Sequence, residues 1–227
     1  MPINPKIVRG IIFDVDGTLH DTDDQFVLRL SGWIKPIRFI SPRIDPVRLA
    51  RWTMMHLETP ANFIYKLADR SGLDGMIAGI NDWLFRLGLI KTPRPYKLID
   101  GVAEMLEVLS PHYLLGIVSA RGKRPTDLFL RTFGIEKYFT AVATAQTCQR
   151  TKPYPDPILW VTRQMGISPA NCIMVGDTTV DILSGKAAGC QTAGVLCGFG
   201  TQDELIKHGA DIILPSTTNL QKVLREN

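Results

Sequence analysis

Short, continuous runs of apolar residues recur along the chain and predict buried strands. The strongest runs, rich in β-branched residues, lie at Lys6 to Phe13, Leu114 to Val118 and Cys172 to Val175. Weaker runs predict further strands at 141–143, 192–196 and 211–214. Runs that are apolar at consecutive positions are typical of strands covered on both faces of a sheet.

Helical patterns separate these strands. One helix is predicted by four apolar positions at helical spacing, Val102, Met105, Leu106 and Leu109. Asp156 followed by Pro157 predicts a helix start with a capping residue and a proline in the first turn. Gly189 predicts the end of a helix that begins near Thr179. The alternation of strand and helix predicts an α/β fold with a doubly wound, Rossmann-like parallel sheet.

The stretch from 20 to 95 breaks this alternation. It contains no convincing strand, two helical stripes begin at Phe26 and Phe63, and six prolines punctuate it. Because proline ends or kinks a helix, we expect short or kinked helices here. The sequence therefore predicts a helical cap domain at 20–95, inserted into an α/β core domain formed by 1–19 and 96–227.

The amino-acid composition mainly excludes certain classes of protein. The chain has 227 residues, 45% hydrophobic and 21% charged, which is typical of a globular protein and excludes intrinsic disorder and collagen. No apolar run approaches the roughly 18 residues that a membrane helix needs, and no signal-peptide pattern precedes the first strand. We expect a cytoplasmic protein with no membrane partner, either a monomer or a homodimer.

The charge distribution bears on the kind of ligand, and the cysteine spacing bears on disulfides and zinc. The net charge of +4 is concentrated in the first half of the predicted cap, where an anionic small molecule is a better candidate than nucleic acid. Four cysteines show no Cys-x-x-Cys spacing and no regular pairing with histidine, so we expect reduced thiols and no zinc site: Cys148, Cys172, Cys190 and Cys197.

The motif with the most evident chemistry follows the first strand. Asp14-Val15-Asp16-Gly17-Thr18 places two carboxylates at the carboxyl end of a strand, where ligands of open α/β sheets bind. Two carboxylates held together repel each other unless a cation or a proton lies between them, and Mg²⁺ is the natural cation. A calcium loop starts in the same way but has a Glu six residues after its Gly, where this chain has Asp23.

Three later features fall at the same expected edge of the sheet. Ser119 ends the second strong strand, Lys152 precedes a predicted helix, and Asp177 and Asp181 follow the third strong strand. Each alone is an ordinary strand-end residue, solvated lysine or helix cap. Together and in this order, they indicate a site that combines carboxylates, a hydroxyl and a fixed positive charge.

These motifs resemble those of the haloacid dehalogenase superfamily, in its phosphatase branch. Four motifs carry the resemblance in turn: Asp14-Val15-Asp16-Gly17-Thr18, Ser119, Lys152-Pro153, and Gly176-Asp177 with Asp181. The match runs from Ile7 to about Ala210. The phosphoglycolate phosphatase-like group is the most similar and carries a helical cap where this chain has its insert.

The resemblance implies a role for each acidic residue. Asp14 would attack phosphorus and form an aspartyl phosphate, and Asp16 would act first as general acid and then as general base. Asp14, the backbone carbonyl of Asp16, and Asp177 would bind Mg²⁺. Asp181 would orient Lys152 or a metal-bound water from outside the first ligand shell.

The resemblance also implies a phosphate-binding set. Its members are Thr18, Ser119, Ala120 and Lys152, together with backbone N–H groups after Asp14. The implied substrate is a small phosphorylated metabolite.

Two positions depart from the common family pattern. Ser119 is followed by Ala120 where many members have Asn, a pattern closer to β-phosphoglucomutase-like relatives. His20 stands where an apolar residue is common, so it is either a hinge residue or a substrate-contacting one. The leading prediction is hydrolysis of a phosphate monoester. The alternatives are a phosphotransferase of the β-phosphoglucomutase type and, more remotely, a non-catalytic phosphate-binding module.

Overall fold

The computed structural model describes residues 3–21 and 96–225 of the chain. The predicted cap lies outside the described residues except for His20 and Asp21, so the division into cap and core remains a prediction. Within the described part, no helix is long and apolar enough to span a membrane.

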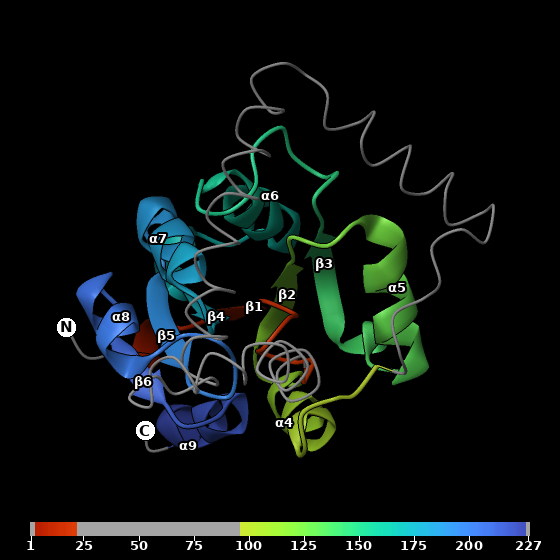
Figure 1. Ribbon diagram of the computed structural model, residues 1–227, viewed down its shortest axis with the longest axis horizontal. Helices are drawn as coiled ribbons and strands as arrows, with labels where there is room; N and C mark the ends of the chain where they lie inside the picture. The colour runs from red at the N-terminus through yellow and green to blue at the C-terminus, as the bar shows by residue number, and fades with distance from the viewer. Residues whose placement is uncertain (1–2, 22–95, 226–227) are drawn as a thin grey trace, which may run out of the picture.

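A six-stranded parallel sheet forms the centre of the fold, in the order β3-β2-β1-β4-β5-β6 (Figure 1). The strands are β1 (Gly10–Phe13), β2 (Leu114–Val118), β3 (Phe139–Ala143), β4 (Cys172–Gly176), β5 (Gln191–Val195) and β6 (Ile212–Leu214). The chain builds β1 to β3 toward one edge and then returns to place β4 on the other side of β1. This reversal is the switch point where open α/β sheets bind ligands, and the predicted fold class is confirmed.

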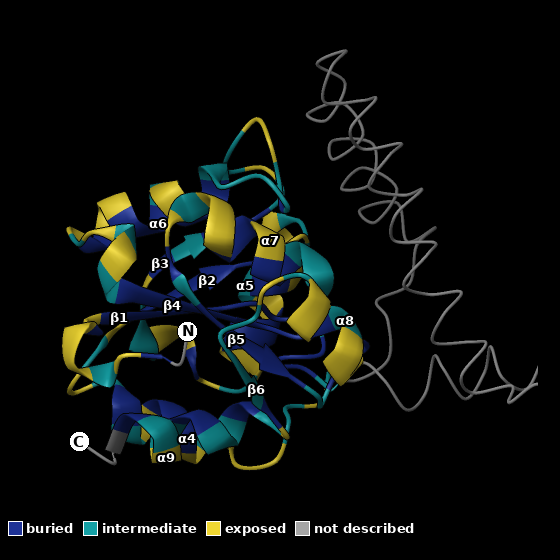
Figure 2. Ribbon diagram, turned by 90° about the vertical axis from the view of Figure 1, so that its left-hand side faces the viewer, coloured by how far each residue is buried: buried dark blue, intermediate teal, exposed yellow. Residues whose placement is uncertain are grey.

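Helices cover both faces of the sheet, with α6 and α7 on one face and α4 and α9 on the other (Figure 2). The α-helices described are α4 (Val102–Leu109), α5 (Lys123–Thr132), α6 (Asp156–Met165), α7 (Thr179–Ala188), α8 (Gln202–Lys207) and α9 (Leu220–Arg225). Short 3-10 helices are η1 (Pro5–Ile7), η3 (Glu136–Tyr138), η4 (Pro169–Asn171) and η5 (Thr217–Asn219).

The two helical layers explain why the central strands β1 and β4 are apolar throughout. Ile11 and Phe13 of β1 pack into the larger core cluster with α4, α5 and α9, whereas Ile12 packs into the cluster with α6. Ile173 and Met174 of β4 divide between the two clusters in the same way. Because successive side chains point to opposite faces, a strand buried on both faces needs an apolar residue at every position.

Two glycines allow α6 to approach the sheet closely. A Cβ atom added at Gly116 of β2 would lie 2.5 Å from Cγ1 of Val161, and one added at Gly10 of β1 would lie 2.6 Å from Cε of Met165. Val161 and Met165 are buried in α6. The helix therefore fills the space that side chains at these two strand positions would occupy.

The strand and helix predictions were mostly right, with two corrections at their ends. The strand expected from Lys6 begins only at Gly10, because Pro5 starts the 3-10 helix η1 and the Asn4 side chain caps it through the N–H of Lys6 (3.2 Å). Asp156 does start α6, but its carboxylate does not cap the helix. It accepts from Nε of Arg150 (3.1 Å) instead.

The weaker strand predictions were confirmed as β3, β5 and β6. Gly189 ends α7 as predicted, with a left-handed φ of 83°. Cys148, Cys172, Cys190 and Cys197 are all free thiols. Among the described residues, the group able to hold a metal ion consists of aspartates alone.

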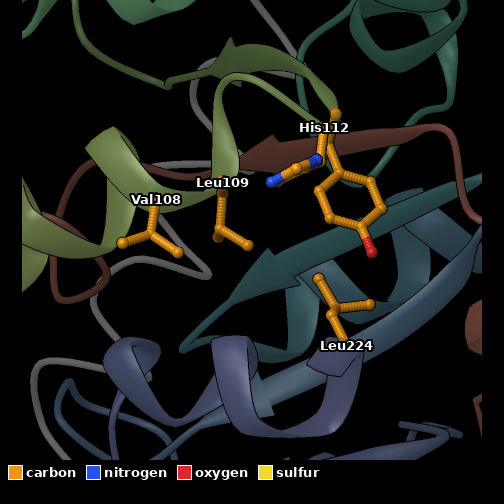
Figure 3. Close-up of a pocket in the computed structure, with 5 residues that line it drawn as sticks. Val108, Leu109, His112 and Leu224 are labelled. Atoms are coloured by element: carbon orange, nitrogen blue, oxygen red, sulfur yellow. The ribbon is translucent and has the colours of Figure 1, made fainter. Parts of the chain in front are cut away.

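A small hollow lies between α4, the loop before β2, and α9. Val108, Leu109, His112, Tyr113 and Leu224 line it, and its volume is about 190 Å³ (Figure 3). Tyr113 directly precedes the first residue of β2, so the hollow lies at the amino ends of the strands. It is therefore remote from the edge where the predicted motif residues gather.

Gly116→Ala should destabilise the fold by about 1–3 kcal/mol, because the added methyl group overpacks the contact with Val161. Gly122→Ala is the matched control: its Cβ would lie 3.4 Å from the nearest atom, so we expect no overpacking and a cost of less than about 1 kcal/mol, because Ala is a poorer N-cap residue than Gly at the start of α5. Urea unfolding measures both. Equal costs would contradict the close approach of α6 to β2.

Candidate active site

The carboxyl ends of the central strands bring the sequence motifs together. Phe13, the last residue of β1, pairs in register with Ile117 of β2 and Val175 of β4. The parallel pairing continues past the strand end, where the N–H of Asp14 donates to the carbonyl of Val175 (2.9 Å). Asp14 thus begins the loop between the two neighbouring strand ends that also carry Ser119 and Asp177.

Gly17 turns the chain immediately after the two acids. Its φ is 72°, in the left-handed region that favours glycine. The N–H groups of Leu19 and His20 both donate to the carbonyl of Val15, which closes the turn. A Cβ atom at Gly17 would overlap the carboxylate of Asp177. Both the backbone conformation and the space available therefore require glycine here.

Lys152 joins Asp14 to Asp181. Its Nζ donates to Oδ1 of Asp14 and to Oδ1 of Asp181, each at 2.6 Å, and all three side chains are buried. Burial alone would lower the pKa of Lys152, but the two carboxylates outweigh burial and raise that pKa above its ordinary value. Lys152 is therefore a permanently protonated, fixed cation.

Asp14 has a strongly perturbed acidity. Burial raises its pKa to about 7, and the negative charges of Asp181 and Asp16 add to the effect, whereas Lys152 opposes it. A carboxyl group in this position takes up a proton readily near neutral pH. A cation bound beside Asp14 would neutralise its charge in place of that proton, so the carboxylate would stay ionised.

Three carboxylates form one compact cluster at this edge. Asp14, Asp177 and Asp181 each offer an oxygen within 4.8 Å of the others, and all three residues are buried. Their oxygens are the donor type that hard divalent cations prefer. Lys152 offsets only one of three negative charges, so the cluster fits a bound divalent cation. The prediction that the backbone carbonyl of Asp16 is also a ligand stays a prediction.

Asp177 is held in place by its surroundings. The N–H of Phe199 donates to its Oδ2 (2.8 Å), and the Thr18 hydroxyl donates to its Oδ1 (3.3 Å). A Cβ atom at Gly198 would overlap the Asp177 side chain, and one at Gly200 would overlap its carbonyl oxygen. The loop after β5 therefore encloses Asp177 closely. Sequence reasoning missed this loop, although its two glycines flanking Phe199 were a signal.

Asp16 faces away from this cluster, toward Arg121 and His20. Nε of Arg121 donates to Oδ2 of Asp16 (2.6 Å), and Nη2 of Arg121 donates to Oδ1. Nδ1 of His20 lies 3.4 Å from Oδ1 of Asp16. Burial would raise the pKa of Asp16, but the hydrogen bond from His20 and the charge of Arg121 outweigh burial and lower that pKa.

His20 contacts Asp16 and Arg121 and thus touches the site, while its role as a hinge residue stays a prediction. Its ring packs edge-on against Tyr96 (5.5 Å between centroids) and Phe129 (5.3 Å). The next residue, Asp21, donates its N–H to the carbonyl of Lys97 (2.8 Å), so Asp21 and Lys97 lie side by side. Arg121 was not anticipated at all, although it lies only two positions after Ser119.

Ser119 and its neighbour occupy the end of β2. The buried Ser119 hydroxyl accepts from the N–H of Arg121 (3.1 Å), and Ala120 is exposed at the rim. Thr18 is fully buried against Asp177. Two groups therefore form at this edge: Asp14, Asp177, Asp181 and Lys152 make one, and Asp16, Arg121 and His20 make the other.

Comparison with known proteins agrees with this arrangement. Residues 11–195 match the family described as haloacid dehalogenase-like hydrolase. The chain belongs to the haloacid dehalogenase-like hydrolase family. It is accordingly an enzyme, as the motifs predicted, and the buried cluster of Asp14, Asp177 and Asp181 is the candidate active site of this hydrolase.

Relatives of this hydrolase match nearly its whole length. Pyrophosphatase PpaX of Bacillus pumilus is 26% identical, covering 98% of this chain and 99% of the relative. The phosphoglycolate phosphatase of Shigella dysenteriae is 35% identical, covering 96% and 92%. A crystal structure of a putative β-phosphoglucomutase from Thermotoga maritima shares the fold, with a TM-score of 0.63, 21% identity and coverage of 96% and 99%.

Lys152→Met should destabilise this hydrolase by about 3–5 kcal/mol in the absence of metal, because it leaves two carboxylates buried without their cation. Lys186→Met is the matched control: Lys186 pairs with Asp211 at 2.5 Å, but its side chain is 38% exposed. Removing that exposed partner should cost less than about 1 kcal/mol. Urea unfolding with a chelator present compares the two, and similar costs would contradict a buried charge network.

The metal-free hydrolase should become more stable as the pH falls from about 7 to about 5. The pKa of Asp14 is about 7 in the folded chain against 3.8 as the ordinary value, so the folded state binds the extra proton in this window. The lowered pKa of Asp16 acts only at more acidic pH. Asp14→Asn should flatten the pH dependence of the unfolding free energy. If this dependence is as steep in the variant as in the wild type, the raised pKa of Asp14 is not its cause.

Proposed function

We propose that this hydrolase is a Mg²⁺-dependent phosphatase that hydrolyses a small phosphate monoester through an aspartyl phosphate on Asp14. The main support is the position of Asp14: it lies buried at the switch point of the sheet, hydrogen-bonded to Lys152 and clustered with Asp177 and Asp181. Phosphoryl transfer needs a fixed nucleophile surrounded by cations and donors, and this arrangement supplies one.

The proposed reaction has two successive steps, the phosphorylation of Asp14 and the hydrolysis of the aspartyl phosphate. Lys152 donates to Oδ1 of Asp14, so we assign Oδ2 as the oxygen that attacks phosphorus. The bond from phosphorus to the leaving oxygen breaks, and Asp16 gives that oxygen a proton. Asp16 then takes a proton from water as the water oxygen attacks phosphorus. The bond between phosphorus and Oδ2 of Asp14 breaks, and inorganic phosphate leaves.

The substrate phosphoryl group would be held from two strand ends. Ser119 and the backbone at Ala120 approach it from β2, Lys152 approaches from the loop before α6, and Thr18 lies on the turn after β1. Lys152 is kept in place by Asp181, whose Oδ2 in turn accepts from the N–H of Thr178 (3.0 Å). Asp181 thereby acts as a positioning residue.

Asp14, Asp177 and the backbone carbonyl of Asp16 would hold Mg²⁺. When bound, the ion neutralises the phosphoryl oxygens and keeps Asp14 ionised at a pH where burial favours its protonated form. Asp177 is prepared for this role by the donors Phe199 and Thr18, which fix the direction of its carboxylate.

The relatives named pyrophosphatase and phosphoglycolate phosphatase support a small phosphorylated metabolite as substrate. A cap formed by residues 20–95 would close over the site and exclude water during chemistry. We also propose that the enzyme is cytoplasmic and that it is a monomer or a homodimer.

The second candidate is a phosphotransferase of the β-phosphoglucomutase type. Ser119-Ala120 and the fold shared with a putative β-phosphoglucomutase favour it, while Thr18 counts against it because mutase-like relatives tend to have an apolar residue there. The two candidates differ in product: a mutase isomerises a sugar phosphate faster than it releases phosphate.

Asp14→Asn should lower phosphate release by on the order of 10⁴-fold or more, because the nucleophile is lost. Removal of divalent cations by a chelator should abolish the wild-type rate, and added Mg²⁺ should restore it. Asp127→Asn, which alters an exposed ion pair of α5 with Lys123, is the control and should keep the wild-type rate.

The assay measures phosphate released from a broad panel of phosphorylated metabolites. Turnover retained by Asp14→Asn would contradict the nucleophile assignment. Wild-type turnover that needs no divalent cation would contradict the metal assignment.

A further inference from the structure

Arg121 occupies both oxygens of the Asp16 carboxylate. Nε and Nη2 form a two-pronged pair with Oδ2 and Oδ1, and Nη2 also lies 3.0 Å from Nδ1 of His20. Such bidentate pairs between guanidinium and carboxylate are strong and directional. Asp16 is therefore held in one orientation by an arginine that neither the sequence motifs nor the proposed chemistry had assigned.

This pairing is not the arrangement in which Asp16 can serve the leaving group. An ionised carboxylate only accepts hydrogen bonds, and both oxygens of Asp16 already accept from Arg121. To give a proton to the leaving oxygen, Asp16 must first release at least one of these hydrogen bonds and take up a proton from solvent on the oxygen that is freed. A guanidinium that is only 20% exposed loses much free energy if it is left without an anion. The release therefore requires another anion for Arg121.

Arg121 has the capacity and the rigidity to bind that second anion. Its Nη1 is buried and has no hydrogen-bond partner in the part of the chain described here. Its guanidinium lies 5.4 Å from the ring centroid of Tyr96, whose hydroxyl is anchored on the carbonyl of Pro125 (3.4 Å). The backbone N–H of Arg121 is tied to the Ser119 hydroxyl (3.1 Å). The planar group thus stands ready beside Asp16.

Resting on the proposed phosphatase function, we propose that Arg121 binds a negatively charged group on the leaving part of the substrate. Arg121 exchanges its ion pair with Asp16 for one with the substrate, and this exchange frees Asp16 to face the leaving oxygen. The substrate class is then phosphate monoesters and anhydrides whose leaving group carries a second anion, a carboxylate or a phosphate.

Lys152 and Arg121 would bind different parts of the substrate. Lys152 is bound to Asp14 and Asp181, so it lies with the carboxylates that would surround the transferring phosphoryl group. Arg121 lies with Asp16, the residue assigned to the leaving oxygen. Specificity for the leaving group is therefore built into the α/β core, at the start of α5 beyond the end of β2 (Figure 1).

The test compares two esters that differ in one charge. Wild type, Arg121→Met and Arg121→Lys are assayed on 2-phosphoglycolate, whose leaving group carries a carboxylate, and on 2-hydroxyethyl phosphate, whose leaving group carries no further charge. Wild type should have the higher kcat/KM for the anionic ester. Arg121→Met should lower the ratio of the two kcat/KM values by on the order of 10²-fold, because one desolvated charge pair is lost.

Arg121→Lys keeps a point charge without the planar fork, so it should recover part of the ratio. It also serves if Arg121→Met folds poorly. Arg131→Met removes the same charge from an exposed position at the other end of α5 and should leave the ratio unchanged. Circular dichroism checks the fold of each variant.

A ratio that Arg121→Met leaves unchanged, including equal losses on both esters, would overturn the proposal. A wild-type enzyme that releases phosphate from other esters but does not prefer the anionic member would also overturn it, while leaving the phosphatase function intact. Absence of phosphate release by wild type from every ester tested would instead refute the phosphatase function itself.

Discussion

The buried contact of Lys152 with Asp14 and Asp181 is the interaction on which the site depends. Two strand ends and a helix start deliver carboxylates to one place, and such a cluster is unfavourable away from water without a counter-charge. One ammonium group at 2.6 Å from two of the carboxylates relieves the repulsion only in part. The remainder shows as the raised pKa of Asp14, and it makes a divalent cation a natural component of the folded site.

The parallel sheet is the reason that these charges converge. β1, β2 and β4 lie side by side and in register, so residues that follow them in sequence emerge at one edge. Tight packing then fixes their positions: Gly17 and Gly198 leave no room for Asp177 to move, and α6 rests directly on glycines of β1 and β2. Catalytic precision and core packing therefore depend on the same glycines and the same strand ends.

Separate partners give the two acids of the first motif opposite properties. Asp14 faces Lys152 and other carboxylates, and burial raises its pKa. Asp16, two residues later, faces Arg121 and His20, which hold its pKa below the ordinary value despite burial. Environments that push neighbouring acids apart in this way are a common means of assigning them distinct chemical roles. Here the difference comes from Lys152 and Arg121, each more than a hundred positions away in sequence, and from His20, four positions after Asp16.

The sequence by itself determined the α/β class, all six strands, and the grouping of Asp14, Ser119, Lys152, Asp177 and Asp181 at one edge. These follow from hydrophobic period and from the rule that ligands bind beyond the carboxyl ends of parallel strands, both of which are local or topological. Only the tertiary structure decided that Asp16 is paired with Arg121 and His20, and that the glycine loop after β5 encloses Asp177. Such contacts depend on side-chain directions and on distances between segments remote in sequence. No periodicity along the chain records either of these quantities.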